Sequence, residues 1–244
     1  MKRLLITLRY DGYAYHGYQV QKNAITVQEV FQNAVEKVFG KRLDVTGCSR
    51  TDSGVHANMY CVCIDCDMDI SNEGVIMALN TYLPNDIAVY ECREVDLSFH
   101  PRYSCKSKEY LYKLYNGKYP NPFLDRYAYW YRFPVDEEYL NEQAQAFLGT
   151  HDFIGFCSSK SDVEDTHRTI YSFDVWRKGD MVYFKVCGDG FLYNMVRIMV
   201  GTLLFVSQGK IKKDELSQVI NSHDRSKAGK TAPAKGLYLN KVNY

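Results

Sequence analysis

Residues 47–57 form the segment of this sequence that is best suited to chemistry. They read Gly-Cys-Ser-Arg-Thr-Asp-Ser-Gly-Val-His-Ala, with Asp52 near the centre. The two glycines free the backbone for a tight path, and the short polar side chains can fix such a loop by local hydrogen bonds. A carboxylate that is ionised and held in place can act as a nucleophile. Asp52 is therefore the candidate reactive residue.

Two arginines could pair with this carboxylate. Arg50 lies two residues away, close enough for a charge-assisted bond that would keep Asp52 ionised and oriented. The alternative is an exposed ion pair in a polar turn, which a lone Arg-x-Asp would favour. Arg197 stands in an otherwise apolar stretch, 195–206, where an unpaired charge would be costly. A buried anionic partner is therefore expected for Arg197.

The pattern of apolar residues predicts the elements that position these groups. In the first half it predicts one helix that is opened by Thr26 and ended by Gly40, and a second helix over 72–82. Glu29, three residues after Thr26, completes a capping box. The expected strands cover 2–9, 43–48, 58–66 and 86–95.

The second half repeats this order with an insertion. The expected strands are 105–115, 168–177, 181–187 and 237–242, and the expected helices are 136–148, 191–207 and 214–221. Both halves read β-α-β-β-α-β, which is the ferredoxin-like motif. We expect an α+β fold with two such halves, residues 1–103 with the Asp52 loop and residues 104–244, whose sheets meet at a central basic cleft.

Charge is segregated along a chain whose net charge is only +1. Residues 1–50, 100–132 and 177–244 are basic, whereas 51–99 and 133–176 are acidic. If the basic segments meet, they form a groove that steers a polyanion; ordinary solvated faces are the alternative. Between residues 103 and 133, eight tyrosines alternate with Lys and Arg. Such a pattern can stack bases and bind phosphates, although most of these tyrosines are expected in the core.

The remaining composition excludes several classes of protein. Eight cysteines are scattered along the chain, and we expect them to be reduced. Cys63 and Cys66 form one C-x-x-C pair, but a structural zinc site needs a second pair. No P-loop or dinucleotide motif is present, so no cofactor is expected. Without a signal-peptide core or a run of roughly 18 apolar residues, the chain is expected to be cytoplasmic and not in the membrane.

Residues 50–57 resemble the signature of the TruA family of tRNA pseudouridine synthases, with Ser53 where alanine is usual. Four further segments are similar to that family's motifs, in the same order: 10–21, with Tyr18 where tryptophan is common, 99–112, 190–197 and 232–239. The resemblance spans nearly the whole chain. It implies the pseudouridine synthase fold and isomerisation of uridine in the anticodon stem-loop of tRNA, at tRNA positions 38, 39 and 40.

The resemblance also implies roles for individual residues. Asp52 would attack the target nucleoside, at the base or at the ribose C1′, and Arg197 would orient it through a salt bridge. Tyr110 would stack on the target base and help to take the proton from C5. Arg50 would enter the RNA, and Leu237 would pack against the uracil ring. Periodicity alone would assign Tyr110 and Leu237 to the core.

No metal or other cofactor is implied, because the reaction breaks and remakes one glycosidic bond. The implied partners are tRNA and a second copy of the chain in a homodimer. Two rival functions remain. An RNA-binding module without catalysis would not need Asp52, and a hydrolase with an Asp nucleophile would need a second acid or base close by.

Overall fold

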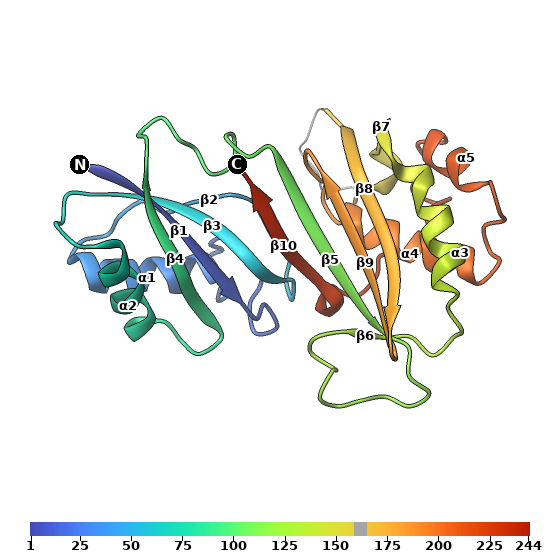
Figure 1. The fold of residues 1–244 in the computed structure, drawn as a ribbon, viewed down its shortest axis with the longest axis horizontal. Coiled ribbons are helices and arrows are strands. Elements are labelled where there is room, and N and C mark those ends of the chain that lie inside the picture. The colour runs from blue at the N-terminus through green and yellow to red at the C-terminus, as the bar shows by residue number, and fades with distance from the viewer. Residues whose placement is uncertain (159–164) are drawn as a thin grey trace. The chain divides into compact units, whose positions relative to one another are not determined.

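The computed structural model describes residues 1–158 and 165–244, which form two compact units (Figure 1). The first unit consists of Met1–Lys106 together with Tyr238–Tyr244, and the second of Ser107–Leu237. The expected division between residues 103 and 104 stays a prediction about the domains. The compact units differ from that division chiefly at the C terminus, because the last strand pairs with a strand of the first unit.

The first unit has the expected order β-α-β-β-α-β. Its elements are β1 (Lys2–Tyr10), α1 (Val27–Phe39), β2 (Thr46–Gly47), β3 (His56–Cys66), α2 (Asn72–Tyr82) and β4 (Ile87–Val95). Strand β1 lies between β4 and β3 and is antiparallel to both, while the short β2 pairs with β3. The last strand of the chain, β10 (Leu237–Asn243), runs parallel to β3, with Tyr238 opposite His56. The predicted order of helices and strands along this part of the chain is confirmed, although β2 is shorter than expected.

Local signals explain both helices of this unit. The Thr26 hydroxyl accepts a hydrogen bond from the Glu29 N–H at 3.4 Å, and Gly40 ends α1 with a φ of 69°. The start and end predicted for α1 are therefore confirmed. Helix α2 begins in the same way, because the Ser71 hydroxyl accepts from the Gly74 N–H at 3.1 Å. The two helices pack against each other.

The second unit contains an antiparallel sheet in the order β5-β9-β8-β7. Its elements are β5 (Ser107–Tyr115), β6 (Tyr129–Trp130), α3 (Glu137–Ala144), β7 (Gly149–Asp152), β8 (His167–Lys178), β9 (Met181–Gly188), α4 (Met195–Ser207) and α5 (Leu216–Asn221), with 3₁₀ turns at Gln145–Phe147, Ile154–Phe156 and Ala234–Gly236. Strands β6 and β7 were not expected, since each is too short for a periodic signal. Helix α4 begins four residues later than predicted, because Asn194 before it takes a left-handed conformation, with a φ of 62°.

All eight cysteines are free thiols. Cys61 and Cys63 alternate with Val62 on β3 and both are buried, and burial raises the pKa of the Cys61 thiol to about 11. Over residues 1–158 and 165–244, no group of three or more His, Cys, Asp or Glu side chains is arranged to hold a metal ion. None of the helices in these two stretches has the length and apolar character that a membrane crossing requires.

The cap of α2 gives a test of this account of the fold. Ser71→Ala should lower the free energy of unfolding by about 1 kcal/mol, because the Gly74 N–H loses its acceptor. Ser71→Asp keeps an acceptor at an exposed position and should stay within a few tenths of wild type. Urea denaturation followed by circular dichroism measures both. An equal loss in the two variants would contradict the role of the cap.

Candidate functional site

Asp52 lies in the loop between β2 and β3, and the loop closes on itself at this residue. The Val55 N–H donates to the Asp52 carbonyl at 3.1 Å, and Gly54 takes a φ of 76°. The carboxylate side chain is half-buried. The tight turn predicted from the two glycines and the short polar residues is therefore formed. It holds Asp52 at a fixed position in the chain just before β3.

A second loop, residues 11–26, binds the Asp52 loop along its length. The Tyr18 N–H donates to the Thr51 carbonyl at 3.1 Å, on one side of Asp52. On the other side, the Tyr15 carbonyl accepts from the Gly54 N–H at 3.2 Å and from the Ser53 hydroxyl at 3.3 Å. The backbone on both sides of Asp52 is thus bonded to the same neighbouring loop.

Two glycines allow this close approach. A Cβ at Gly12 would lie 1.9 Å from the Val55 carbonyl oxygen, and a Cβ at Gly17 would lie 2.5 Å from the Thr51 carbonyl oxygen. Gly17 also has a φ of 84°, which side-chain-bearing residues rarely adopt. Gly12 and Gly17 are therefore required by the close contact between the loop over residues 11–26 and the Asp52 loop, and not only by the turn in which they lie.

Buried tyrosines support the Asp52 loop from the strands. The Tyr10 hydroxyl is 2.8 Å from the Thr51 hydroxyl, and the Tyr60 hydroxyl donates to the Ser49 carbonyl. The rings of Tyr18 and Tyr60 stack at 4.2 Å, and burial raises the pKa of Tyr60 well above its usual value. Tyr60 therefore stays a neutral hydrogen-bond donor. Apart from the abundance of tyrosine, no pattern in the sequence predicts these contacts.

His56 connects the loop over residues 11–26 to the start of β3. Its side chain is only 1% exposed, and its ring stacks on Tyr238 of β10 at 4.7 Å. The Nδ1 atom lies 3.0 Å from the Gly12 N–H nitrogen and 3.0 Å from a carboxylate oxygen of Asp11. The Gly12 N–H donates to Nδ1, and the Asp11 carboxylate lies beside the same atom. His56, which was not among the predicted site residues, therefore fixes the beginning of that loop.

Arg50 does not form the pair that its spacing from Asp52 suggested. Its side chain is exposed, and no ion pair joins it to Asp52 within the part of the chain that the structure describes. Hydrogen bonds with Tyr10, Tyr15, Tyr18 and Tyr60 fix the loop instead, so no local partner is needed to hold its shape. Arg50 is accessible to a ligand from solution.

The other predicted residues lie in the second unit. Tyr110 is on β5 and only 7% exposed, with its ring edge-on to Phe191 at 5.1 Å. Tyr112 follows on the same face of the strand, and its hydroxyl donates to the Pro233 carbonyl at 2.8 Å. Leu237, 5% exposed, directly follows the 3₁₀ turn Ala234–Gly236. Tyr112 therefore connects the strand of Tyr110 to the segment that carries Leu237.

Arg197 joins the same segment from helix α4. Its Nε donates to the Ala232 carbonyl at 2.7 Å, and one terminal nitrogen donates to the Asn194 side chain at 2.6 Å. Burial raises the pKa of Tyr112, and the nearby positive charge of Arg197 opposes this shift. The second unit thus brings Tyr110, Leu237 and Arg197 around Tyr112. Because Asp52 belongs to the first unit, its pairing with Arg197 stays a prediction.

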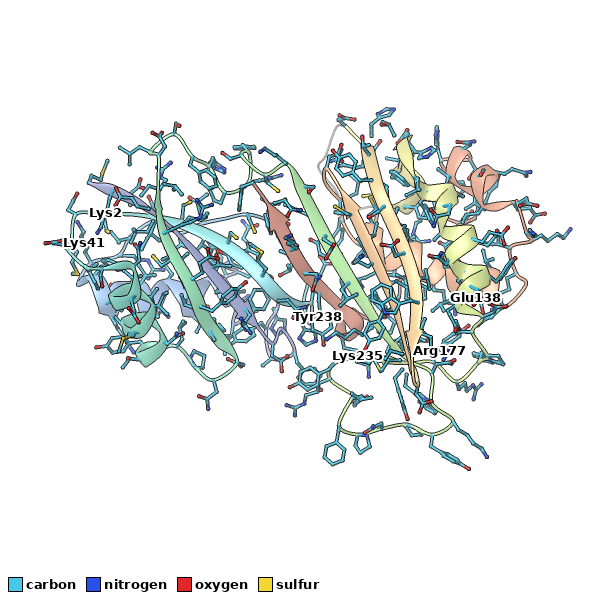
Figure 2. All side chains as sticks on the ribbon, viewed as in Figure 1. Lys2, Lys41, Glu138, Arg177, Lys235 and Tyr238 are labelled. Atoms are coloured by element: carbon cyan, nitrogen blue, oxygen red, sulfur yellow. The ribbon has the colours of Figure 1, made fainter. Side chains whose placement is uncertain are left out.

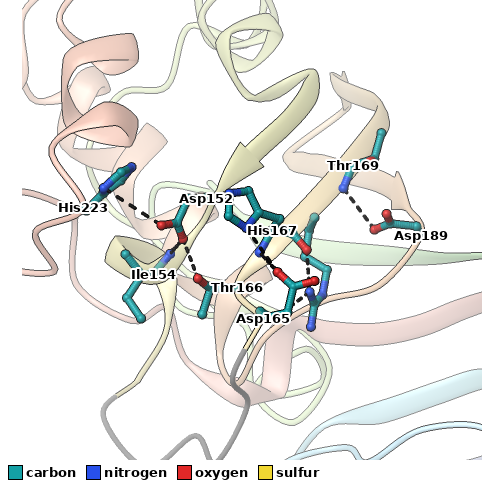
Figure 3. Close-up of polar contacts among 9 residues, drawn as sticks. Asp152, Ile154, Asp165, Thr166, His167, Thr169, Asp189 and His223 are labelled. Atoms are coloured by element: carbon teal, nitrogen blue, oxygen red, sulfur yellow. Dashed lines mark hydrogen bonds and ion pairs between the residues drawn. The ribbon is translucent and has the colours of Figure 1, made fainter.

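A further group of acidic and histidine side chains lies between β7 and β8 (Figure 3). Asp152 accepts from the Ile154 N–H at 3.0 Å and from the Thr166 hydroxyl at 2.5 Å, and lies 3.9 Å from His223 Nδ1. Burial acts to raise the pKa of Asp152, but the Thr166 and Ile154 hydrogen bonds outweigh it and hold the pKa below its usual value. These bonds connect the end of β7 to Thr166, the residue that precedes β8.

Comparison with known proteins gives a consistent result. A family model described as tRNA pseudouridine synthase matches residues 6–104 and 143–244. The tRNA pseudouridine synthases A of Thermoanaerobacter sp. (strain X514) and of Acetivibrio thermocellus are 44% and 45% identical over 244 residues, and each alignment covers all of both chains. A chain in the structure of a Cbf5-Nop10-Gar1 complex aligns with 85% of this chain and 54% of its own length, at 11% identity and a TM-score of 0.39. A likeness that weak adds nothing to the family match.

The contact at Gly17 gives a test of how the site is built. Gly17→Ala should lower the free energy of unfolding by more than about 2 kcal/mol. The strain of a positive φ accounts for about 1 kcal/mol of this loss, and the clash of the added Cβ with the Thr51 carbonyl for the rest. The exchange of the Gly54 and Val55 amide hydrogens should become at least about ten times faster than in wild type. Urea denaturation and hydrogen exchange measure the two effects.

Gly40→Ala is the matched control. Gly40 has a similar positive φ of 69°, but no atom lies within 4 Å of its added Cβ. Gly40→Ala should lower the free energy of unfolding by about 1 kcal/mol, from backbone strain alone, and leave amide hydrogen exchange in the Asp52 loop unchanged. The same exchange rates in the two variants would show that Gly17 does not position the Asp52 loop.

Proposed function

Because the chain belongs to the tRNA pseudouridine synthase family, we propose that it isomerises uridine in the anticodon stem-loop of tRNA with Asp52 as the nucleophile. The observation that carries this proposal is the fixed position of Asp52, whose flanking backbone is bonded on both sides to the loop over residues 11–26. A nucleophile held in place before substrate binds loses little freedom in the reaction, which lowers the barrier. Unlike a hydrolase site, the arrangement requires no second carboxylate beside it.

The reaction balances without any cofactor. The bond between C1′ and N1 of the uridine breaks, the uracil turns, and a bond forms between C1′ and C5. The C5 proton is lost and N1 gains a proton, so there is no net oxidation or reduction. Asp52 supplies the electron pair that forms a temporary covalent bond to the nucleoside, at the base or at C1′, and recovers it when the product leaves.

The residues of the second unit supply recognition and orientation in this proposal. Tyr110 stacks on the uracil, and the edge-on ring of Phe191 fixes its orientation. Tyr110 also helps to remove the proton from C5. Leu237 packs against the uracil, and Arg197 orients Asp52 through a salt bridge. The planar guanidinium of Arg197 is suited to this because the Ala232 carbonyl and the Asn194 side chain already fix its plane.

The family match also supports proposals for the partner and the compartment. We infer a homodimer that works in the cytoplasm, where tRNA is modified. The exposed Arg50 enters the RNA and supports the nucleotide that is taken out of its stack. An RNA-binding module without catalysis would use the same exposed groups, so only the requirement for Asp52 separates the two functions.

Substitution of the nucleophile tests the proposal. Asp52→Asn removes the charge and should lower the rate of pseudouridine formation by a factor of at least about one thousand, while tRNA binding is retained. Carbodiimide-adduct mapping of an unmodified tRNA pool reports both activity and position, as new stops in reverse transcription. Asp44→Asn, an exposed carboxylate just before β2, should leave the stops unchanged. Wild-type protein that gives no stops, or Asp52→Asn that gives as many, would refute the assignment.

Arg197 allows a second test, of orientation. Arg197→Lys keeps the charge but loses the planar pair of donors, so the turnover rate should fall by about 10 to 100 times with little change in tRNA affinity. Arg177→Lys is a matched control at a residue labelled in Figure 2. Arg177 also donates to a carbonyl and to a side chain in the second unit, and it pairs with Glu137 at 2.8 Å. Arg177→Lys should lower stability but not turnover. Equal turnover in the two variants would show that Arg197 has only a structural role.

A further inference from the structure

The segment from Gly117 to Phe133, which we call the aromatic loop, exposes an unusual share of large side chains. It leaves the end of β5 and extends away from the sheet of the second unit before it returns through β6 (Figure 1). Its large exposed side chains are Phe123 (87% exposed), Tyr119 (67%), Phe133 (43%), Tyr127 (41%) and Trp130 (37%). Soluble proteins rarely expose apolar groups together in this way unless the surface binds a partner.

Cations alternate with these rings. The loop contains Lys118, Arg126 and Arg132 but only one acidic residue, Asp125. Lys118 Nζ lies 5.3 Å from the centre of the Tyr119 ring, and the Arg132 guanidinium lies 5.0 Å from the centre of the Phe133 ring. Aromatic faces beside cations are the groups with which proteins bind single-stranded nucleic acid, since the rings stack on bases and the cations bind phosphates.

The loop has a defined shape, so that little order has to be gained when it binds. The Trp130 indole N–H donates to the Gly117 carbonyl at 3.1 Å, and the Asn116 side chain donates to the Tyr131 and Phe133 carbonyls at 2.7 and 2.8 Å. Pro120 and Pro122 further restrict the backbone around Tyr119 and Phe123. Such preorganisation favours a binding surface over a flexible connection.

An ion pair links this loop to the segment of Leu237. Lys235 Nζ lies 2.6 Å from a carboxylate oxygen of Asp125, and Lys235 is part of the 3₁₀ turn that precedes Leu237 (Figure 2). A cavity of about 530 Å³ lies here, and its walls include Tyr129, Trp130, Pro233 and Lys235. Its volume is in the range of sites that bind small organic groups such as a nucleoside. The aromatic loop is thus connected to the segment that carries Leu237, the residue predicted to contact the uracil.

We propose that the aromatic loop binds unpaired nucleotides of the tRNA, outside the uridine that is isomerised, by stacking their bases on Phe123 and Tyr119. This inference rests on the proposed function, which supplies tRNA as the partner. RNA is favoured over a second copy of the chain because three cations and a single carboxylate accompany the rings, and Lys118 and Arg132 are exposed beside ring faces.

Binding measurements test the proposal without requiring turnover. All variants are made in the Asp52→Asn protein, and the affinity for unmodified tRNA is measured by filter binding. Phe123→Ala and Tyr119→Ala should each weaken binding by about ten times, the effect of losing one stacked base. Phe123→Tyr should bind like the parent because it keeps a ring, whereas Phe123→Leu should resemble Phe123→Ala because it keeps only apolar bulk.

Tyr82→Ala is the control. Tyr82 is 49% exposed on α2, with Lys37 Nζ 5.6 Å from its ring centre, so it reproduces the Lys118 and Tyr119 pair on the helices of the first unit. Its loss should leave tRNA affinity unchanged. Unchanged affinity in Phe123→Ala and Tyr119→Ala, or a loss as large in Tyr82→Ala, would overturn the inference. Full binding by Phe123→Leu, together with a change of oligomeric state in Phe123→Ala, would identify a second copy of the chain as the occupant instead.

The two proposals can fail separately. If wild-type protein forms pseudouridine but the loop variants bind tRNA normally, only the role of the aromatic loop is wrong. If wild-type protein forms no pseudouridine but Phe123→Ala weakens binding and Phe123→Tyr does not, the loop is a tRNA contact and the proposed function is wrong. Absence of tRNA binding by the Asp52→Asn protein would refute the loop proposal directly.

Discussion

The Asp52 loop can keep its shape because two backbone segments approach each other without side chains between them. Gly12 and Gly17 face the carbonyl groups of Val55 and Thr51, at distances that leave no space for a Cβ. Hydrogen bonds between the same two segments then fix the turn on both sides of Asp52. A polar loop of this kind would otherwise be mobile, and a mobile carboxylate loses much of its value as a nucleophile. The position of the Asp52 carboxylate therefore depends on this close contact.

Around this contact, neutral groups provide most of the support. The hydroxyl groups of Tyr10 and Tyr60 bind the Asp52 loop, and burial keeps the Tyr60 hydroxyl protonated. His56 binds the neighbouring loop over residues 11–26. In the second unit, Arg197 is likewise fixed by a carbonyl and an amide oxygen. Neutral groups can hold a residue in place without adding a further charge beside it. Such support suits the proposed reaction, in which a carboxylate forms and then loses a covalent bond.

Features with local signals could be predicted from the sequence, and features that join distant segments could not. Helix α1 was predicted because Thr26 and Gly40 mark its ends within the sequence itself. The hydrogen bond from Ser53 to Tyr15 joins residues 38 positions apart, so no spacing rule could reveal it. For the same reason, the short distance from Arg50 to Asp52 suggested a pair that does not form. The cost of burying a charge predicts an anionic partner for Arg197, and its pairing with Asp52 stays a prediction.

The place of the last strand has a consequence for how the protein is made. Strand β10 lies beside β3, with Tyr238 opposite His56 and stacked on its ring. Asp52 is only four residues before that point, yet Tyr238 is synthesised after the whole of Ser107–Leu237, which forms the second unit. Domains usually fold as they emerge from the ribosome, but here the first unit lacks one of its strands until the second unit has been synthesised. A nascent chain that has not reached β10 would therefore carry Asp52, the proposed nucleophile, on a sheet that still lacks a strand.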